Sequence, residues 1–567
     1  MSTTLSRRSF IGAAGATVAA AAGATGLTVA RADETAAAAA PLTADVLNQQ
    51  WSFEIAPEPI TDIAETVDCE LVVVGGGTSG LAAACSGAQA GLGTILVSGS
   101  TGPVCRGGSN HCTYSKVMER EGVERYDVEN FYLSELAANS FKVDNRKWYK
   151  FYNNSEESMN WLLDMLFEEG YDAVLEITNV DDFDSPTNSP VASHSFVSPD
   201  MQMAGVGQAF AVNTLAKNIE AAGGRIFWET VAKQLVRGGK PNGTEGRVEG
   251  VICQKADGTF VQYNASKGVV LATGDFSRDK DMMAKYCPWC VELIDWENNQ
   301  DYDYDFGLHP NEPLGIFHGD GHKMGLWVGA AWQKVYPNAP MVQGSWVCAA
   351  QPYGGPRGIL LDSTGTRFCN EDMGGAGNAM QSMQLKDRTA YTIWGSNFAE
   401  DAAPWHKFGQ ADGADPIPPA DIVAGWEESV ASGAYVKADT IEEVAELLGL
   451  PVEATVASVE RYNEMAAAGK DTDFYKKAKY LQPIADGPFY GAPTAGVVFY
   501  TVMGGLRTNE NMQVCTDDDQ PIPGLYNVGT MAGDMFANIY NFRMQGHNYG
   551  QCLCFGYLTG KYIAENE

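Results

Sequence analysis

The stretch that decides the fold is Cys69-Glu70-Leu71-Val72-Val73-Val74, followed directly by Gly75-Gly76-Gly77-Thr78-Ser79-Gly80 and then by Leu81-Ala82-Ala83-Ala84. The first segment is apolar and β-branched and the last has a helical composition, so together they predict a strand, a glycine turn and a helix. Gly75 permits the tight turn, Gly77 lets the backbone approach a diphosphate, and Gly80 lets the helix pack close to the strand. We therefore expect a dinucleotide here, with its diphosphate at the helix N-terminus beside Thr78 and Ser79.

One residue of this predicted dinucleotide site departs from the usual pattern. The helix should end near Gly91, and Thr94-Ile95-Leu96-Val97 should form the second strand of a βαβ unit. The end of that strand normally carries an acid that accepts the hydrogen bonds of the adenosine ribose. Here the position is Ser98, whose hydroxyl makes one neutral contact in place of a charged bidentate pair. We expect Ser98 to contact the ribose, either with lower cofactor affinity or with another group that compensates.

Length and composition describe a large globular protein. The chain has 567 residues, of which 45% are hydrophobic, and this length predicts roughly two to four domains. The formal net charge of −33, with the acids spread along the chain, argues against a nucleic-acid partner. Twelve cysteines are too sparse for a disulfide scaffold. The absence of C-x-x-C-H excludes a covalently attached c-type haem.

The N-terminus has the features of an export signal. Ser6-Arg7-Arg8-Ser9-Phe10-Ile11 is a twin-arginine motif, followed by an Ala/Gly-rich run and an A-x-A site at Ala30-Arg31-Ala32. We expect residues 1–32 to be cleaved and the mature protein to be periplasmic or at the cell surface. The alternative is an uncleaved membrane anchor, which the Ala/Gly-rich composition disfavours. Residues 33–66 are predicted to be a flexible leader and linker.

Four further segments carry a family resemblance. They are Arg106-Gly107-Gly108-Ser109-Asn110, Gly268-Val269-Val270-Leu271-Ala272-Thr273-Gly274-Asp275-Phe276, Gly319-Asp320-Gly321-His322-Lys323-Met324, and Met503-Gly504-Gly505-Leu506 with the following Ile522-Pro523-Gly524-Leu525-Tyr526-Asn527-Val528-Gly529. In order and spacing the chain resembles the flavoprotein family of fumarate reductases, succinate dehydrogenases and 3-ketosteroid dehydrogenases over about residues 67–567.

The resemblance implies an α/β fold in which a Rossmann-like FAD-binding domain carries an inserted α+β capping domain. The expected boundaries are 67–285 and 496–567 for the FAD-binding domain and 286–495 for the capping, substrate-binding domain. Beyond the first glycine turn, the residues expected at the cofactor are Arg106, Gly107, Gly108, Ser109, Thr273, Gly274, Asp275, Gly529 and Asp534. FAD is expected to be non-covalent, because covalent relatives use a histidine before the Arg106 loop and none lies between Gly80 and Gly108. His111, just after the loop, is the alternative attachment point.

The residues that act on fumarate are missing. The family's R-F-x-N-E motif is present at residues 367–371, but Gln351, Gly354 and Gly375 stand where the resemblance puts the proton relay and proton donor. The dicarboxylate-binding histidine falls near Thr501, and only Arg543 remains of the cations. Binding a small dianion takes several cations, so we expect a substrate that is larger, flatter or more apolar than fumarate. The aromatic residues of residues 286–495 agree with this.

The remaining candidates suggest catalytic roles. Tyr500, Tyr540, Arg543 and His547 lie in segments that the resemblance places around the flavin. We expect a tyrosine to donate the proton and Arg543 to anchor the substrate; the alternative for Arg543 is a structural ion pair. Tyr353 and Arg357 are secondary candidates.

The sequence therefore predicts an exported FAD-dependent reductase of an activated C=C bond in a small organic acceptor, used in anaerobic respiration or detoxification. Its electrons would come from a separate protein or quinol. A dehydrogenase of the ketosteroid type and a non-catalytic flavin electron shuttle are the alternatives. Cys287-Pro288-Trp289-Cys290 is a C-x-x-C that can be a redox dithiol, half of a zinc or iron–sulfur site, or structural. The structural interpretation is favoured and no metal is expected.

Overall fold

The structure is a computed structural model that describes residues 49–105, 108–176, 192–200, 207–294, 296, 317–343, 358–386, 388–401, 418–494, 497–541 and 544–567. The predicted signal and the first part of the leader, residues 33–48, lie outside these residues. The chain forms two compact units. Of the described residues, those between 49 and 341 and those from 500 to 567 belong to the large unit, and those between 342 and 499 belong to the small unit.

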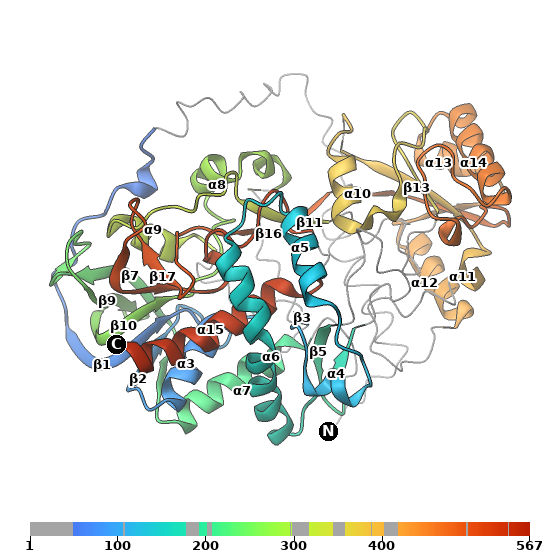
Figure 1. The fold of residues 1–567 in the computed structure, drawn as a ribbon. Coiled ribbons are helices and arrows are strands. Elements are labelled where there is room, and N and C mark those ends of the chain that lie inside the picture. Colours follow the sequence, from blue (N-terminus) through green and yellow to red (C-terminus); the bar gives the residue numbers. More distant parts are fainter. Residues whose placement is uncertain are drawn as a thin grey trace. The chain divides into compact units, whose positions relative to one another are not determined.

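The large unit is built on a nine-stranded sheet (Figure 1). Strands β6, β2, β1, β10 and β18 pair in parallel in that order, and β9, β7 and β8 extend the sheet with antiparallel pairs, as does β17 beside β18. The bounds are β1 (Glu65–Val74), β2 (Thr94–Val97), β6 (Arg225–Phe227), β7 (Thr230–Arg237), β8 (Lys240–Pro241), β9 (Val248–Lys255), β10 (Phe260–Leu271), β17 (Gln513–Cys515) and β18 (Pro521–Asn527). This mixed sheet with a parallel centre confirms the predicted α/β, Rossmann-like fold.

Both faces of the sheet are buried, which explains why β1 is continuously apolar. Leu71 and Val73 join one core with α3 (Thr78–Gln89), α6 (Asn145–Glu168), α7 (Gln208–Ala221) and α15 (His547–Asn566), whereas Val72 and Val74 join a second core with α9 (Asp320–Trp327). Alternate side chains of a strand point to opposite faces. Because each face has its own cover, every residue of Leu71–Val74 is apolar.

Smaller elements complete the large unit. Strands β3 (Asn110–His111), β5 (Ser193–Val197) and β4 (Asp172–Leu175) form a three-stranded antiparallel sheet, and β11 (Ala339–Gln343) pairs with β16 (Val498–Met503). The remaining helices are α4 (Lys116–Arg120), α5 (Val128–Ala138) and α8 (Lys280–Tyr286). The short 3₁₀ helices are η1 (Ser52–Glu54), η2 (Pro288–Leu293) and η5 (Gly529–Met531).

The small unit has an antiparallel sheet of its own. Its strand order is β12 (Ile359–Leu361), β13 (Ala390–Gly395), β15 (Phe489–Thr494) and β14 (Val436–Ala438). The helices are α10 (Gly374–Ser382), α11 (Phe398–Asp401), α12 (Pro419–Ala431), α13 (Ile441–Leu448) and α14 (Val452–Ala467), and the 3₁₀ helices are η3 (Glu371–Met373) and η4 (Ala478–Tyr480). Trp394 and Tyr490 stack in its core, with centroids 5.7 Å apart. The unit therefore has the α+β composition expected of the cap.

The small unit begins later in the chain than the expected cap at 286–495, because the chain from 286 to 341 groups with the large unit. Described side chains account for this grouping. The Asn338 amide donates to the carbonyl of Met503 at 2.8 Å, and Nε2 of His322 lies 3.3 Å from the carbonyl oxygen of Gly504. These contacts attach α9 and the following loop to the large unit.

The R-F-x-N-E motif is a buried ion-pair network within the small unit. Arg367 donates to both oxygens of Glu371 at 2.9 and 2.8 Å and to Asp471 at 2.8 Å. Burial alone would raise the pKa of Asp471, but hydrogen bonds from Arg367 and from backbone amides lower it to about 2. The motif therefore stabilises the unit's own fold.

The segment that precedes β1 is partly fixed. Phe53 is buried, its carbonyl accepts a hydrogen bond from Trp327 Nε1 at 2.9 Å, and Glu54 accepts one from Lys285 at 2.6 Å. Farther along, the Ile60 amide donates to Gln234 at 2.9 Å. The predicted flexible leader thus contains a stretch that is packed against the large unit.

Candidate active site

The glycine turn after β1 is shaped by close backbone contacts. Gly75 has a φ of +120°, and a Cβ there would lie 2.2 Å from the carbonyl oxygen of Ala272. A Cβ on Gly80 would lie 2.0 Å from the carbonyl oxygen of Gly75. No larger side chain fits at either place, so the turn and the close packing expected from these two glycines are present.

The N-terminus of α3 is suited to a diphosphate. Its N-cap residue is Gly77, no side chain caps the helix, and a Cβ on Gly77 would meet only the Val104 carbonyl oxygen, at 3.8 Å. The Thr78 hydroxyl is fixed by the Gln208 amide at 3.0 Å. First-turn amides without a side-chain cap, facing open space, form an anion-binding site. The residues present therefore fit the diphosphate of a dinucleotide.

Ser98 lies next to this turn. Its hydroxyl is 2.7 Å from that of Ser100, and it is 3.1 Å from the position that a Cβ on Gly76 would take. Its backbone also bonds to Phe227 and Thr230. Ser98 thus stands at the end of β2 where the ribose-binding acid was expected, and its ribose contact remains a prediction.

The loop after β2 depends on a buried acid that sequence reasoning missed. Arg106 and Gly107 lie outside the described residues. Ser109 donates to Glu176 at 2.9 Å, and Glu176 also accepts hydrogen bonds from Ser195 and, at 2.6 Å, from Gln545. Burial raises the pKa of Glu176, against the effect of these donors. Glu176 connects the predicted flavin loop of Gly108 and Ser109 to the residues just before α15, and no motif marks it in the sequence.

The segment after β10 meets β16 through the buried carboxylate of Asp275. The Thr273 hydroxyl accepts the Gly321 amide at 3.1 Å, and Gly274 has a φ of +81°. Asp275 is 1% exposed; it accepts hydrogen bonds from the Ser277 amide and hydroxyl at 2.9 and 2.8 Å and from the Thr501 hydroxyl. The Asp275 carboxylate therefore contacts Thr501, near which the resemblance puts the family's dicarboxylate-binding histidine.

The second glycine turn, Gly529 to Asp534, is held from two sides. The Asp534 carboxylate accepts the backbone amides of Lys334 and Val335, both at 2.9 Å. Lys147 donates to the Gly533 carbonyl at 2.7 Å and is fully buried. Burial lowers the pKa of Lys147, and the charges of Asp534 and Asp144 oppose this. Lys147 is a further residue that sequence reasoning missed.

The predicted catalytic residues are placed as follows. Arg543, Tyr353 and Arg357 lie outside the described residues. Tyr500 is half-buried in β16. The buried Tyr540 hydroxyl donates to the Met544 carbonyl at 3.1 Å and accepts the Asn548 amide at 3.3 Å, and burial raises its pKa well above 10.

His547 begins α15 inside an aromatic cluster. The rings of Trp148 and Phe151 are each centred 4.7 Å from it, and that of Phe536 5.1 Å. Burial lowers the pKa of His547 to about 3. The His547 imidazole is therefore neutral at physiological pH. It carries no imidazolium proton that it could donate to a substrate.

The C-x-x-C residues Cys287 and Cys290 are buried free thiols, and Cys287 contacts the Asn338 carbonyl at 3.5 Å. Over the described part of the chain, no group of three or more His, Cys, Asp or Glu side chains is arranged to hold a metal ion.

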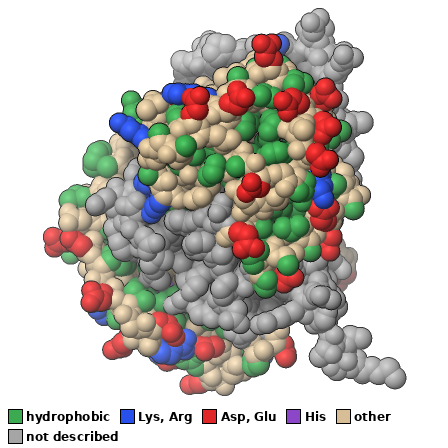
Figure 2. Space-filling view, turned by 90° about the vertical axis from the view of Figure 1, so that its right-hand side faces the viewer, with side chains coloured by type: hydrophobic (Ala, Val, Ile, Leu, Met, Phe, Trp, Pro, Cys, Tyr) green, Lys and Arg blue, Asp and Glu red, His purple; other side chains and the backbone are tan. Residues whose placement is uncertain are grey.

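Within the same residues, no helix is both long enough and apolar enough to cross a bilayer. Figure 2 shows acidic side chains dispersed over one face of the protein.

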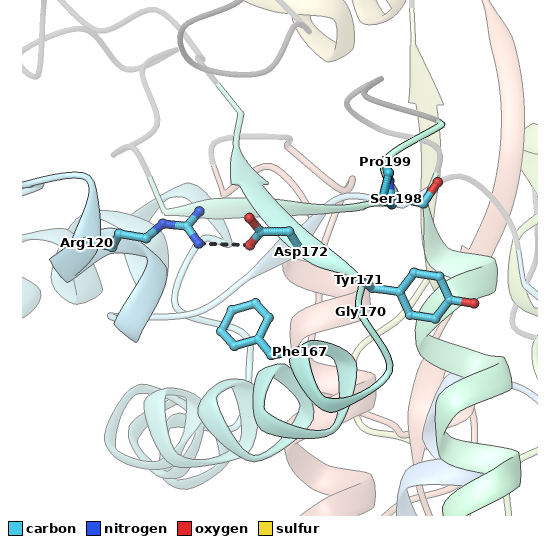
Figure 3. Close-up of a pocket in the computed structure, with 7 residues that line it drawn as sticks. All are labelled: Arg120, Phe167, Gly170, Tyr171, Asp172, Ser198 and Pro199. Carbon is cyan, nitrogen blue, oxygen red and sulfur yellow. Dashed lines mark hydrogen bonds and ion pairs between the residues drawn. The ribbon is translucent and has the colours of Figure 1, made fainter.

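A pocket of about 460 Å³ lies between the ends of α4 and α6 and the start of β4 (Figure 3). Arg120 and Asp172 form an ion pair of 2.8 Å at its edge. Its other lining residues are Phe167, Gly170, Tyr171, Ser198 and Pro199. None of the predicted site residues lines it, so it is separate from the candidate active site.

Comparison with known proteins identifies the class. Residues 70–542 match the family described as FAD binding domain, so the chain belongs to this family and binds FAD. It is 26% identical to the vinyl phenol reductase of Lactiplantibacillus plantarum, over 88% of this chain and 96% of that protein. It is also 26% identical to the urocanate reductase of Eggerthella lenta, over 86% of this chain and 73% of that protein.

Among solved structures, the fold is similar to that of 3-ketosteroid-Δ4-(5α)-dehydrogenase from Rhodococcus jostii RHA1 in complex with 4-androstene-3,17-dione. The TM-score is 0.67 at 23% identity, covering 90% of this chain and all of that one. The protein is an FAD-dependent oxidoreductase that acts on CH–CH groups. Its relatives include both reductases and dehydrogenases.

Proposed function

We propose that this protein is an FAD-dependent reductase of an activated C=C bond in an organic acceptor that is larger or more apolar than fumarate. The observation that carries the proposal is the Tyr540 phenol. It is buried, its hydroxyl bonds to the Met544 carbonyl and the Asn548 amide, and it lies three residues before Arg543 in the segment expected around the flavin. A phenol that keeps its proton at neutral pH is suited to general acid catalysis. The similarity to a vinyl phenol reductase over nearly its whole length supports the reductive direction.

FAD would be held by the glycine turn at Gly75–Gly80 and by the second turn at Gly529–Asp534, and when bound it would supply hydride chemistry to one carbon of the double bond. Arg543 binds the oxygen that polarises the double bond, and Tyr540 or Tyr500 gives a proton to the other carbon. Tyr540 is oriented for this by its bonds to Met544 and Asn548. Lys147 and Asp534 hold the second glycine turn in place. The aromatic cluster around His547 is buried and excludes water from the start of α15.

The experiment is anaerobic reduction of the purified protein with a reduced viologen dye, followed by addition of enones, enoates and hydroxycinnamates. We expect at least one unsaturated compound to reoxidise the flavin. A protein that is bleached by saturated ketones and reoxidised by no enone would instead be the dehydrogenase. Yellow protein that reacts with no acceptor in either direction would be the electron shuttle.

The proposal includes export and a separate electron donor. The twin-arginine motif at Arg7 and Arg8 and the A-x-A site support removal of residues 1–32 and a location outside the cytoplasm. A donor protein or quinol would then supply the electrons, since the sequence has no C-x-x-C-H motif for covalent haem attachment. Mature protein from the native host is expected to begin at Asp33, and a change of both Arg7 and Arg8 to Lys should retain the precursor in the cytoplasm. Intact precursor outside the cell would contradict this part of the proposal.

A further inference from the structure

Three buried polar side chains connect the loop after β2 to the first turn of α3. The Asn110 amide donates to the Gly108 carbonyl at 3.1 Å and to Oε1 of Gln208 at 2.6 Å. Nε2 of Gln208 in turn donates to the Thr78 hydroxyl at 3.0 Å. Asn110 and Gln208 are fully buried, and Thr78 is 5% exposed. We call this series of hydrogen bonds the Asn110–Gln208–Thr78 relay.

The direction of the relay is fixed at its backbone end. The Gly108 carbonyl can only accept, so the atom of Asn110 that faces it is the amide nitrogen. The same nitrogen faces Gln208, which therefore presents its oxygen to Asn110 and its nitrogen to Thr78. Each amide has a single orientation that satisfies both of its neighbours. The relay therefore holds the loop and the helix in one arrangement.

Gln208 is itself placed by tight packing at the start of α7. It is the first residue of α7, and the N-cap residue before it is Gly207. A Cβ on Gly207 would lie 1.7 Å from the carbonyl oxygen of Phe196 in β5, so no larger residue fits there. The side chain of Gln208 thus reaches Thr78 from a fixed point of the backbone.

The loop after β2 is attached to the glycine turn at a second point. The Val104 amide donates to the Gly76 carbonyl at 2.9 Å. Gly77 lies in the chain between Gly76 and Thr78, the two attached residues, and a Cβ on Gly77 would meet only the Val104 carbonyl oxygen, at 3.8 Å. Open space beside first-turn amides that no side chain caps fits a diphosphate. Both attachments border this space.

We propose that Gln208 is a positioning residue for the FAD diphosphate, which acts by holding the loop after β2 and the first turn of α3 at the spacing that leaves room at Gly77. It does so through Asn110 on one side and Thr78 on the other, without contacting the cofactor. The inference concerns FAD binding, which follows from the family. It depends neither on the substrate nor on the direction of catalysis, so failure of the reductase proposal would leave it standing.

The first test removes the centre of the relay. Gln208→Met keeps most of the side chain's volume and removes both of its hydrogen bonds. We expect the dissociation constant of FAD, measured by flavin fluorescence on adding FAD to protein from which it has been removed, to rise on the order of 10-fold. The ³¹P resonances of bound FAD should shift, whereas its visible absorption maxima should not, because the change lies at the diphosphate. Unchanged affinity and unchanged ³¹P resonances in folded Gln208→Met would overturn the inference.

The second test asks whether Gln208 acts through Thr78. In the Thr78→Val background the relay is already broken, so Gln208→Met should raise the dissociation constant by less than about 2-fold. An equal effect of Gln208→Met in both backgrounds would overturn the inference. Where Gln208→Met does not fold, Thr78→Ser and Thr78→Val decide: the serine keeps the hydroxyl and should bind FAD more tightly, and equal affinity of the two variants contradicts the relay.

The matched control is Gln234 in β7. It is also a buried glutamine with both ends of its amide engaged, since it donates to the Glu58 carbonyl at 2.8 Å and accepts the Ile60 amide at 2.9 Å. Gln234→Met should lower the free energy of unfolding and leave FAD affinity and the ³¹P resonances unchanged. Equal weakening of FAD binding by Gln234→Met and Gln208→Met would show a general loss of stability and overturn the positioning role.

Discussion

Nζ of Lys147 in α6 lies 2.7 Å from the carbonyl oxygen of Gly533, in the turn that precedes Asp534. The next residue, Trp148, donates its Nε1 to the Met535 carbonyl at 2.8 Å, and the Asp144 amide donates to the Asp534 carbonyl at 2.8 Å. Three successive backbone carbonyls of the second glycine turn are thus held by the first turn of one helix. The helix therefore determines the conformation of a segment expected to contact FAD.

Replacement of Lys147 tests this arrangement. Lys147→Met keeps most of the side chain's length, removes its ammonium group and leaves the buried Gly533 carbonyl without its donor, which should cost about 1–3 kcal/mol of unfolding free energy. We also expect weaker FAD retention, measured by flavin fluorescence after dialysis. Lys217→Met serves as control, because Lys217 is an exposed lysine paired only with Glu169, and its loss should change stability by less than about 0.5 kcal/mol. Equal effects of the two changes would refute the holding role.

Arg543 is predicted to anchor the substrate. Arg543→Lys keeps the charge and loses the planar fork, so kcat/KM should fall roughly 30- to 1000-fold, or about 2–4 kcal/mol in transition-state binding. FAD content should not change. The change in kcat/KM is measured by steady-state kinetics with the best acceptor from the viologen assay. Full activity of the variant would show that Arg543 does not anchor the substrate, and Tyr353 and Arg357 would become the next candidates.

The two tyrosines can be separated by matched variants. Tyr540→Phe should lower kcat with little change in KM, because a proton given only in the transition state contributes little to substrate binding. The free energy of unfolding of the Tyr540→Phe variant should also decrease, because the Tyr540 hydroxyl bonds to the Met544 carbonyl and the Asn548 amide. Tyr500→Phe is the comparison. If flavin reoxidation by substrate stays at the wild-type rate in both variants, neither tyrosine is the donor.

Stability should fall as the pH is lowered below about 6.5. Burial lowers the pKa values of His547 and His322 to about 3 and that of His194 to about 4, from 6.5. In this interval the unfolded chain binds protons that the folded chain does not, so the unfolding free energy decreases by up to about 1.4 kcal/mol per pH unit for each histidine. Urea unfolding at pH 7, 5.5 and 4.5 measures the slope. His547→Phe should reduce the number of protons taken up on unfolding by one and so make the slope less steep. An unaltered slope would contradict the burial of a neutral His547.

FAD is predicted to be held without a covalent bond. His111 is the alternative attachment point named from the sequence; its ring is buried, its centroid is 6.4 Å from that of Phe151, and its Nε2 is 3.5 Å from the Tyr126 hydroxyl. Precipitation with acid should therefore give a colourless pellet and a yellow supernatant. A yellow pellet that loses its colour in His111→Ala would identify His111 as the attachment point.

The sequence predicts the local parts of this site well and the long-range parts poorly. The turn at Gly75 and Gly80 is specified by neighbouring residues, so a short motif is sufficient to predict it. Glu176 and Lys147 meet partners 369 and 386 positions away in the chain. Such contacts depend on how the β4–β5 sheet and α6 pack, and a single sequence carries no periodic signal for them. The small unit was predicted as an α+β insertion, but its start depends on side-chain contacts of Asn338 and His322 that composition does not show.

The bridge through Glu176 has a consequence for biosynthesis. Ser109 and Gln545 are far apart in the chain, so the acid has its full set of donors only when both segments have been synthesised and have packed together. The same holds for α15, where Gly556 and Gly560 lie close to Ser79 and Ser86 of α3. A nascent or prematurely terminated polypeptide would leave both ends of this interface exposed. Cofactor loading should therefore follow the packing of these distant segments against one another.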